Sequence, residues 1–305
     1  LNAIGFAGEM LVSTVSGGVM HVADVAERPI YMVKSGPAMA PRAGIAYAEA
    51  ENLNTDLLVV DSGGTTFDVS LVRDGEVKFT RETWLGPLFY GHNLGLSSVD
   101  VRSVGAGGGS LAWIDSGGLL CVGPGSAGAV PGPACYGRGG TEPTLTDAAV
   151  VLGYIDPDHF LSGRMPLNVE AARAAVGGIA AVLELTLVEA AFSILRIASE
   201  SMIKAIEEIT VNEGVNPRES ILVAGGGAAG LNILPIAEAL GCRQVLLPKT
   251  AGVLSACGAQ YSDVVAEFSA SQYVRTDHWN GKLVAATLAD LEWQMEDFAD
   301  GLRKR

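Results

Sequence analysis

The chain has few cysteines, few aromatic residues and too little positive charge for several classes of protein. Its four cysteines (Cys121, Cys135, Cys242, Cys257) form no Cys-x-x-Cys pair, which argues against a disulfide framework or a zinc ribbon. Twenty lysines and arginines stand against 34 acidic residues, for a formal net charge of −14. The clustered basic residues of a nucleic-acid binder are therefore missing, and we expect no nucleic-acid partner.

Long apolar runs are also absent. No stretch reaches the roughly 18 consecutive apolar residues of a membrane span, so no membrane partner is expected. No basic stretch precedes an apolar one near the start, as a signal peptide would require. We therefore expect a cytoplasmic protein with reduced thiols. The sequence begins at Leu1 rather than methionine, which we interpret as the start of a fragment.

Glycine, by contrast, is abundant, with 39 residues. The most informative cluster, Asp61-Ser62-Gly63-Gly64-Thr65-Thr66, lies between apolar runs at 57–60 and 69–72. This order predicts a strand, a tight turn and a strand. Glycines would let backbone N–H groups reach phosphate oxygens, the threonines could add hydroxyl donors, and Asp61 could hold hydrated Mg²⁺. An ordinary hairpin turn explains the same residues equally well.

Two further glycine clusters favour a nucleotide site. Gly105-Ala106-Gly107-Gly108-Gly109-Ser110 precedes a strand-like run at 111–114. Gly225-Gly226-Gly227 follows an apolar run at 221–224 and precedes a helical pattern. Neither cluster carries the lysine of a P-loop, and neither shows a full GxGxxG context with an acidic residue about 20 positions on. Walker and Rossmann sites are therefore disfavoured.

The order of the clusters resembles the sugar-kinase, actin and heat-shock-chaperone superfamily of ATPases. There, two hairpin loops, one per lobe, hold the phosphates, and a glycine-rich strand-to-helix turn holds the adenosine. The resemblance implies a catalytic, Mg²⁺-organising role for Asp61. It implies nucleotide contacts from three segments: Ser62, Gly63, Gly64, Thr65 and Thr66; Gly105, Gly107, Gly108, Gly109 and Ser110; and Gly225, Gly226 and Gly227.

The segments between the clusters are similar to the hydantoinase A / 5-oxoprolinase family, which includes ATP-dependent acetone and acetophenone carboxylase subunits. The similarity lies in Ser35-Gly36-Pro37-Ala38, in Pro131-Gly132-Pro133-Ala134-Cys135-Tyr136-Gly137 and in Pro143-Thr144-Leu145-Thr146-Asp147-Ala148, and extends from about residue 18 to about 265. In that family Leu1 would follow an N-terminal domain, so the resemblance implies a fragment lacking it. It also implies ATP and Mg as cofactors and a second, unrelated catalytic subunit as partner.

Several residues allow two interpretations. Asp147 is either a helix N-cap or a catalytic carboxylate, and the resemblance favours the second. His92 is either a solvated loop residue or, with Cys135, a zinc ligand. The family usually has a histidine where this chain has Arg102 and an aspartate where it has Val130. That departure predicts a degenerate metal site and no stoichiometric transition metal.

Glu200, Lys204 and Glu207 recur at four- and three-residue spacing on one face of a predicted helix. The spacing alone favours a surface ion-pair row. The resemblance to the chaperones implies instead that Glu200 and Lys204 contact the adenosine.

The expected fold class is α/β, an actin-like (ribonuclease H-like) ATPase core with two lobes of mixed sheets and flanking helices. Residues 1–165 would carry both phosphate loops and a Gly/Pro-rich insertion at 124–143 without regular structure. Residues 166–265 would form the helical, adenosine-binding part, and 266–305 the start of a C-terminal segment. Apolar periodicity predicts helices at 36–51, 186–213 and 284–302, and another continues over 235–240.

The function implied by the resemblance is ATP-dependent activation of a small-molecule carbonyl or amide substrate by phosphorylation. Hydrolysis of a hydantoin, 5-oxoproline or a lactam, or carboxylation of acetone or acetophenone, would follow. The alternative is a non-catalytic nucleotide-binding switch or a structural paralogue subunit of such a complex.

Overall fold

The computed structural model describes residues 2–53, 55–86, 89–265 and 281–303. It forms two compact units, Leu1–Asp263 and Val264–Arg305. The second unit contains one long helix, α8 (Gly281–Arg303), where the sequence predicts a helix at 284–302.

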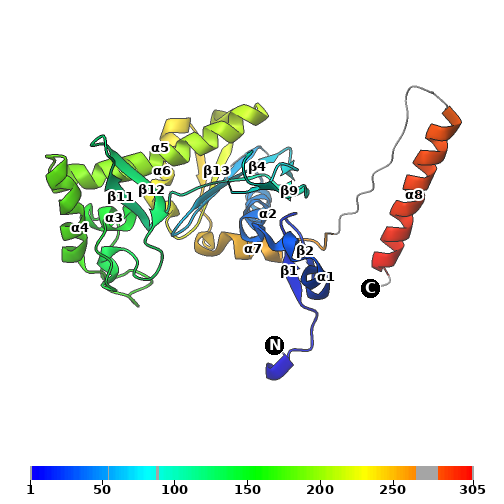
Figure 1. Ribbon diagram of the computed structural model, residues 1–305, viewed down its shortest axis with the longest axis horizontal. Coiled ribbons are helices and arrows are strands. Elements are labelled where there is room, and N and C mark those ends of the chain that lie inside the picture. Colours follow the sequence, from blue (N-terminus) through cyan, green and yellow to red (C-terminus); the bar gives the residue numbers. More distant parts are fainter. Residues whose placement is uncertain (1, 54, 87–88, 266–280, 304–305) are drawn as a thin grey trace. The chain divides into compact units, whose positions relative to one another are not determined.

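A six-stranded mixed sheet is the centre of the first unit (Figure 1). Its strand order is β10-β4-β3-β13-β14, and β5 pairs with β4 at its side. β4 runs antiparallel to β3 and β10, whereas β13 runs parallel to β3 and β14. The strands are β3 (Leu57–Ser62), β4 (Phe67–Arg73), β5 (Glu76–Val77), β10 (Val101–Val104), β13 (Ile221–Gly225) and β14 (Gln244–Leu246).

Helices cover both faces of this sheet. α2 (Ser35–Ala50) and α7 (Leu254–Gln260) lie on one face, and α5 (Leu187–Glu213) and α6 (Ala229–Leu240) on the other (Figure 1). Successive residues of a strand point to opposite faces. Leu58 and Val60 therefore pack with the α5 and α6 side, whereas Leu57 and Val59 pack with the α2 side. Burial on both faces explains why these strands are continuous apolar runs.

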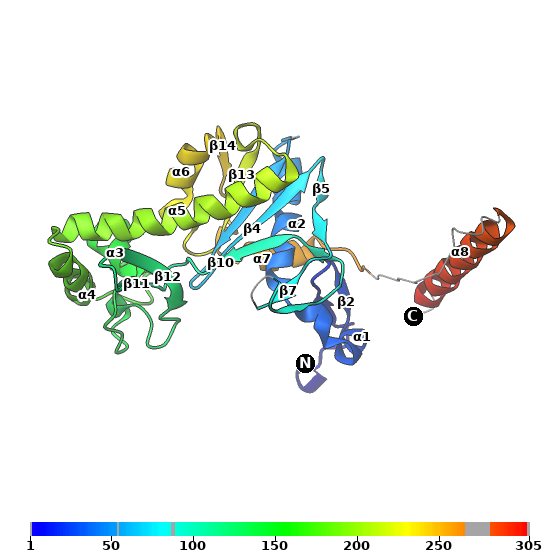
Figure 2. The ribbon, with the colours of Figure 1, turned by 45° about the horizontal axis from the view of Figure 1, so that its top comes forward.

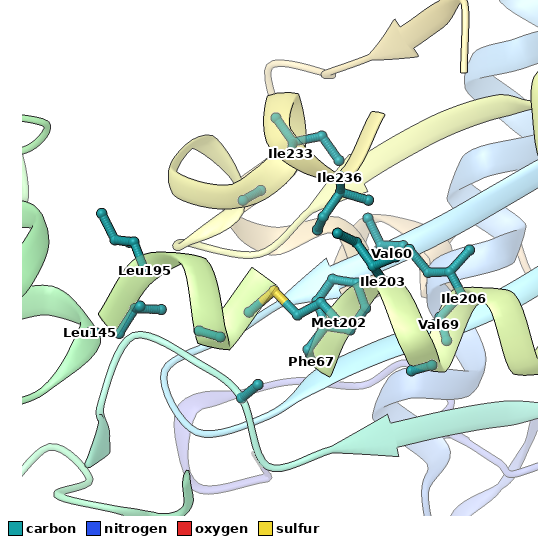
Figure 3. Close-up of a cluster of buried hydrophobic side chains, with 14 of the residues drawn as sticks. Val60, Phe67, Val69, Leu145, Leu195, Met202, Ile203, Ile206, Ile233 and Ile236 are labelled. Atoms are coloured by element: carbon teal, nitrogen blue, oxygen red, sulfur yellow. The ribbon is translucent and has the colours of Figure 1, made fainter. Parts of the chain in front are cut away.

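Figure 3 shows the larger of these cores, where Met202, Ile203 and Ile206 of α5 lie among side chains of the sheet and of α6. The mixed sheet with flanking helices confirms the expected α/β, actin-like class. Both candidate phosphate loops border this one sheet, and the described residues contain no second large sheet. The one-per-lobe arrangement of the two clusters stays a prediction.

α5 begins and ends where its sequence predicts. Thr186 is its N-cap and forms a capping box with Glu189, and Gly214 ends it in the left-handed region at φ 65°. These contacts satisfy backbone groups that a helix end leaves without partners. In Figure 2, α5 extends from the central sheet towards α3 (Leu145–Val151) and α4 (Val169–Val182). No single helix in the described residues is long and apolar enough to cross a membrane, and only α4 and α5 together, bent by 90°, pass that test.

The remaining described elements are short. Four two-stranded sheets pair β1 (Leu11–Ser13) with β2 (Val19–His21), β6 (Phe79–Thr80) with β9 (Ser98–Val99), β7 (Trp84–Leu85) with β8 (His92–Asn93), and β11 (Ser110–Ile114) with β12 (Leu120–Ser126). The short helices are η1 (Asn2–Ile4), α1 (Val22–Glu27), η2 (Pro29–Met32), η3 (Ala134–Tyr136), η4 (Pro217–Glu219) and η5 (Ala251–Val253).

One expectation from the breaker residues is wrong. Regular structure enters the 124–143 insertion, because β12 continues to Ser126 and η3 forms at Ala134–Tyr136. Pro124 is exposed in β12, in the stretch where the pairing with β11 is irregular, so no regular ladder bond is needed there. The helix expected to continue over 235–240 is confirmed, because α6 covers Ala229–Leu240 and contains Pro235. Its buried Ile233, Ile236 and Leu240 stabilise a helix that the exposed proline does not end.

Candidate functional site

Three glycine segments, far apart in sequence, meet at one end of the sheet. Gly108 N donates to Gly63 O (3.0 Å) and Gly109 N to Gly64 O (2.6 Å), which ties the loop after β10 to the β3–β4 turn. Ala228 N donates to Ser62 O (2.9 Å), which ties the turn after β13 to the same hairpin. The structure thus brings together all three clusters that the sequence singles out.

Glycine is required here because the loops pack on one another. An ideal Cβ on Gly107 would lie 2.7 Å from Gly63 O and 2.8 Å from Thr65 N. Gly226 has φ +90°, and its Cβ would lie 2.6 Å from Asp61 Oδ1 and closer still to Ser62 O. The sequence suggests glycine for approach to phosphate, whereas at these two positions the structure needs it for approach to protein backbone.

The free backbone donors belong to the first and third segments. The N–H groups of Gly107, Gly108 and Gly109 are taken up by Ser110 Oγ, Gly63 O and Gly64 O. Within the described residues, no hydrogen bond involves the N–H groups of Gly64, Thr65, Thr66 or Gly227, and all four residues are exposed. Unpaired, exposed amides in a tight turn are suited to binding an anion. The second loop therefore supports the first loop through hydrogen bonds, and its Gly107, Gly108 and Gly109 amides are not free to bind an anion.

A pocket of about 570 Å³ opens where these segments meet. Its lining comes from Gly64, Gly108 and Gly109, from Thr146, from the turn at Gly227, Ala228, Gly230 and Leu231, and from Gly128, Tyr136, Tyr154, Ile155, Asp156, His159, Phe160 and Leu161. A pocket that joins polar backbone to aromatic side chains has the usual composition of a small-molecule site.

The structure does not bring Glu200 and Lys204 to this pocket. Lys204 instead lines a separate hollow of about 340 Å³ with Gly105, Pro124 and Glu208, and Glu200 lines neither space. Contact of Glu200 and Lys204 with the adenosine therefore stays a prediction, which neither of these two pockets supports. No ion pair joins Glu200, Lys204 and Glu207 in the described part of the chain either.

Asp61 has an acidic neighbour that sequence reasoning missed. Asp61 in β3 stands opposite Asp68 in β4 in the antiparallel register. Ser255 Oγ donates to Asp61 Oδ2 (3.0 Å), and Asp68 accepts from Ser103 Oγ and from Thr66 Oγ1 (3.3 Å). The symmetric positions of the two aspartates about the turn are the signal that could have paired them.

Burial raises the pKa of both aspartates. For Asp61, burial outweighs the opposing effect of the Ser255 hydrogen bond. For Asp68, burial is again the largest cause, and the negative charge of Asp61 raises its pKa further against the bonds from Ser103 and Thr66. Oxygen ligands and excess negative charge fit a hard divalent cation such as Mg²⁺.

Ser62, at the end of β3, is also placed unusually. Its hydroxyl is buried and has no hydrogen-bond partner in the described structure. A buried hydroxyl without a partner is costly and often marks a functional position.

Asp147 is buried in a network of protein donors. It accepts from Thr144 N (3.0 Å), Thr144 Oγ1 (2.8 Å), Ala134 N (3.1 Å) and Cys135 N (2.7 Å), and its exposed fraction is 0%. The N-cap of α3 is Thr144, and Asp147 is the third helical residue of a capping box. A helix cap is thus present, but its N-cap residue is Thr144, three positions before Asp147. Catalysis by Asp147 stays a prediction, and the contacts provide a structural role.

Cys135 and His92 lie in different elements. Cys135 is buried in η3, where burial and the neighbouring charge of Asp147 raise the pKa of its thiol. His92 is exposed in β8, and Arg102 pairs with Asp100 at 3.2 Å. Within the described residues, no group of three His, Cys, Asp or Glu side chains could hold a metal ion. The absence of a stoichiometric transition metal stays a prediction.

Comparisons with known proteins agree with this architecture. The family model for hydantoinase/oxoprolinase matches residues 1–268. Caprolactamase subunit alpha of Pseudomonas jessenii is 39% identical over 82% of this chain and 35% of its own length. The acetophenone carboxylase gamma subunit of Aromatoleum aromaticum is 38% identical over 89% of this chain and 36% of its own length.

Solved structures give the same result. A nucleotide-free acetone carboxylase, described for ATP-dependent acetone carboxylation, superposes with a TM-score of 0.78 at 27% identity, over 86% of this chain and 36% of that one. The ATP-dependent caprolactamase of Pseudomonas jessenii superposes with a TM-score of 0.74 at 36% identity, over 86% of this chain and 38% of that one. The chain thus spans little more than a third of these relatives, and it belongs to the hydantoinase/oxoprolinase family.

Proposed function

We propose that this chain binds ATP with Mg²⁺ in the 570 Å³ pocket and forms the nucleotide-binding part of an ATP-dependent hydrolase or carboxylase. The observation that carries the proposal is the convergence of the three glycine segments, with unpaired, exposed amides at Gly64, Thr65, Thr66 and Gly227. Backbone N–H groups in such a turn bind phosphate oxygens without needing a positive side chain. The net charge of −14 is therefore compatible with an anionic ligand.

The side chains beside these amides have distinct roles in the proposal. Asp61 and Asp68 would hold Mg²⁺, which neutralises phosphate charge when bound. The Thr65 hydroxyl, which accepts from Ser126 Oγ at 3.3 Å, remains free to donate to a phosphate oxygen. Ser62 would supply the buried hydroxyl that still lacks a partner in the described structure. Together they would position a terminal phosphoryl group for transfer to a carbonyl or amide oxygen.

The substrate and partner are proposed from the relatives. Their names describe a lactam hydrolase, ketone carboxylases and 5-oxoprolinases, several of them as subunits. We propose a small carbonyl or amide compound as substrate and a second, unrelated subunit as partner, in the cytoplasm. The chain alone is then expected to bind nucleotide without turning over substrate.

The test of metal-assisted binding is Asp61→Asn. Calorimetry with ATP should show roughly a tenfold or greater loss of affinity in Mg²⁺, because the variant removes a charge that faces the metal. In EDTA the loss should be smaller. Asp74→Asn is the matched control, because Asp74 is an exposed turn residue away from the pocket. Equal losses with and without Mg²⁺ would contradict the role of Asp61.

A nucleotide-binding switch is the second candidate. The observation in its favour is that the Asp147 carboxylate, to which the resemblance gives a catalytic role, already accepts four hydrogen bonds from protein donors. Phosphoryl transfer from labelled ATP to a small molecule, measured with the partner subunit present, distinguishes the two functions. ATP binding without transfer would favour the switch.

A further inference from the structure

The short segment 251–255 packs against the candidate site on the α2 face of the sheet. It consists of η5 and the first two residues of α7. Ala251 O accepts from Gly226 N at 2.7 Å. An ideal Cβ on Gly225 would clash with the side chain of Leu254, which is buried. The segment therefore lies directly against the turn after β13.

The same segment reaches the first glycine cluster through Ser255. Asp61 pairs with Gly225 in the parallel register of β3 and β13, so it lies at the same strand ends. Ser255 Oγ donates to Asp61 Oδ2 at 3.0 Å, and the described residues provide no other hydrogen bond to this carboxylate. Asp61 Oδ1 lies only 2.6 Å from the position that a Cβ on Gly226 would occupy. One carboxylate oxygen is thus held by α7, and the other lies beside the Gly226 turn.

Contacts outside the site fix α7 in place. It lies beside α2 (Figure 1), and an ideal Cβ on Gly258 would clash with Met39 O of that helix. Tyr47 OH, also on α2, lies 2.5 Å from Thr250 Oγ1, immediately before η5. Close packing of two backbones and a side-chain hydrogen bond fix α7 against α2. Ser255 is therefore a donor whose position is set before any ligand binds.

The neighbouring aspartate has donors of its own. Asp68 stands opposite Asp61 in the β3–β4 register and accepts from Ser103 and Thr66. Two ionised carboxylates repel one another when no cation lies between them. A hydrogen bond from a fixed donor opposes the rotation that this repulsion favours, and Ser255 supplies that bond to Asp61.

We infer that Ser255 is a positioning residue, whose hydroxyl holds the Asp61 carboxylate in the orientation that binds Mg²⁺ together with the nucleotide. This inference rests on the proposed function. It assigns to α7 a role in metal binding, although Ser255 itself need not touch the metal or the nucleotide. Removal of a group that orients a metal ligand commonly lowers metal affinity tenfold or more.

The alternative is a purely structural role, in which Ser255 satisfies a partly buried carboxylate and stabilises the fold. Its removal would then lower the stability without changing how ATP binding depends on Mg²⁺. The quantity that separates the two roles is the Mg²⁺ requirement, defined as the Mg²⁺ concentration at which half of the Mg²⁺-dependent gain in ATP affinity is reached.

The experiment is calorimetry with ATP on the full chain, over a series of Mg²⁺ concentrations and in EDTA. Ser255→Ala removes the hydroxyl. Ser255→Thr keeps it, and Ser255→Val has the shape of threonine without it, so that the comparison of these two isolates the hydroxyl. Ser262→Ala is the matched control, because the Ser262 hydroxyl donates to Gly258 O of α7 at 2.9 Å and not to Asp61.

A double-mutant cycle tests whether Ser255 acts through Asp61. Ser255→Ala is compared in the wild-type and Asp61→Asn backgrounds. Because the orienting bond has no carboxylate to act on in Asp61→Asn, Ser255→Ala should have no further effect on ATP affinity there. Thermal unfolding without ligand, measured on every variant, reports the structural contribution separately.

The expected result is a selective change in the Mg²⁺ requirement. Ser255→Ala and Ser255→Val should raise it about tenfold and leave the ATP affinity in EDTA unchanged. Ser255→Thr and Ser262→Ala should keep the wild-type requirement. An unchanged requirement in Ser255→Ala and Ser255→Val, equal weakening in Mg²⁺ and EDTA, or the same loss in the Asp61→Asn background would overturn the inference. A wild type that binds no ATP, or binds it equally well with and without Mg²⁺, would instead overturn the proposed function.

Discussion

At the scale of single residues, neighbouring glycines in this site have different physical roles. Gly226 is held at φ +90° against the β3 backbone, whereas Gly227, one residue later, has open space around its missing side chain. Gly107 is like Gly226 in this respect, because an ideal Cβ on it would clash with the backbone of the first loop. We therefore expect Gly107→Val to push these two loops apart and to unfold this part of the structure locally.

The first residue-scale prediction contrasts adjacent glycines. Gly226→Ala should lower the free energy of unfolding by about 3 kcal/mol, because it adds a steric clash to a strained backbone. Gly227→Ala should change it by less than about 0.5 kcal/mol. Urea denaturation of the two variants measures the difference. Similar stability of both would show that the turn does not need the close contact between Gly226 and Ser62.

The second residue-scale prediction concerns the raised pKa of Asp68. A carboxyl whose folded pKa is raised stabilises the fold fully below its ordinary value of 3.8, and this contribution is lost as the pH rises through the raised value. At pH 7 the ionised carboxylate of Asp68, buried opposite Asp61, therefore destabilises the wild-type fold. Asp68→Asn should raise the stability at pH 7 by about 1 kcal/mol, a few degrees in Tm.

The pH dependence of Asp68→Asn checks the cause. The gain over wild type should shrink as the pH falls and vanish below about pH 3.8. Asp74→Asn, at an exposed turn position, should show no such change. A gain that is constant between pH 7 and pH 4 would indicate that hydrogen bonding, rather than charge burial, determines the effect.

At the scale of elements, the chain carries the same capping box in two environments. Thr144 and Asp147 begin the buried helix α3, and Thr186 and Glu189 begin the exposed end of α5. The exposed pair serves only its own helix. Asp147 also accepts N–H groups from Ala134 and Cys135, so it links η3 of the insertion to α3, directly beside the pocket residue Thr146.

The element-scale prediction uses this pair of motifs. Asp147→Ala should cost about 3 kcal/mol or more, because it leaves several buried donors without an acceptor. Glu189→Ala should cost about 1 kcal/mol, as usual for an exposed cap. Thermal unfolding of both variants is the measurement. If Asp147→Ala kept wild-type stability and lost only activity with the partner subunit, the result would support a catalytic role for Asp147.

At the scale of the whole molecule, the folded core belongs to the first unit. The three buried apolar clusters, with the side chains packed against them, contain no residue beyond Ala259 in the described part of the chain. The first unit therefore has the features of an independently stable domain.

Truncation tests this division. A chain ending at residue 265 keeps Asp263, whose carbonyl accepts from Val19 N at 2.9 Å. Its Tm should lie within about 2 °C of the full chain's, because none of the described core residues is removed and a change well below 1 kcal/mol is expected. A loss of cooperative unfolding would show that the C-terminal unit contributes to the first.

Much of the fold could be predicted from local patterns. The continuous apolar runs of β3 and β13, the apolar stripe of α5 and its flanking Thr186 and Gly214 each act over a few neighbouring residues. Glycine clusters likewise marked the three segments of the site. These features depend on short-range geometry, and the sequence by itself therefore determined them.

Tertiary structure alone decided what those segments can do. The Gly108 amide is occupied because Gly63, far away in sequence, supplies its acceptor, whereas no described residue takes up the Thr65 amide. Asp147 became a buried link, Lys204 was placed away from the pocket, and Tyr154 was brought to it. Hydrogen-bond partners, burial and empty space arise between distant parts of the chain, so no local pattern of residues could have assigned them.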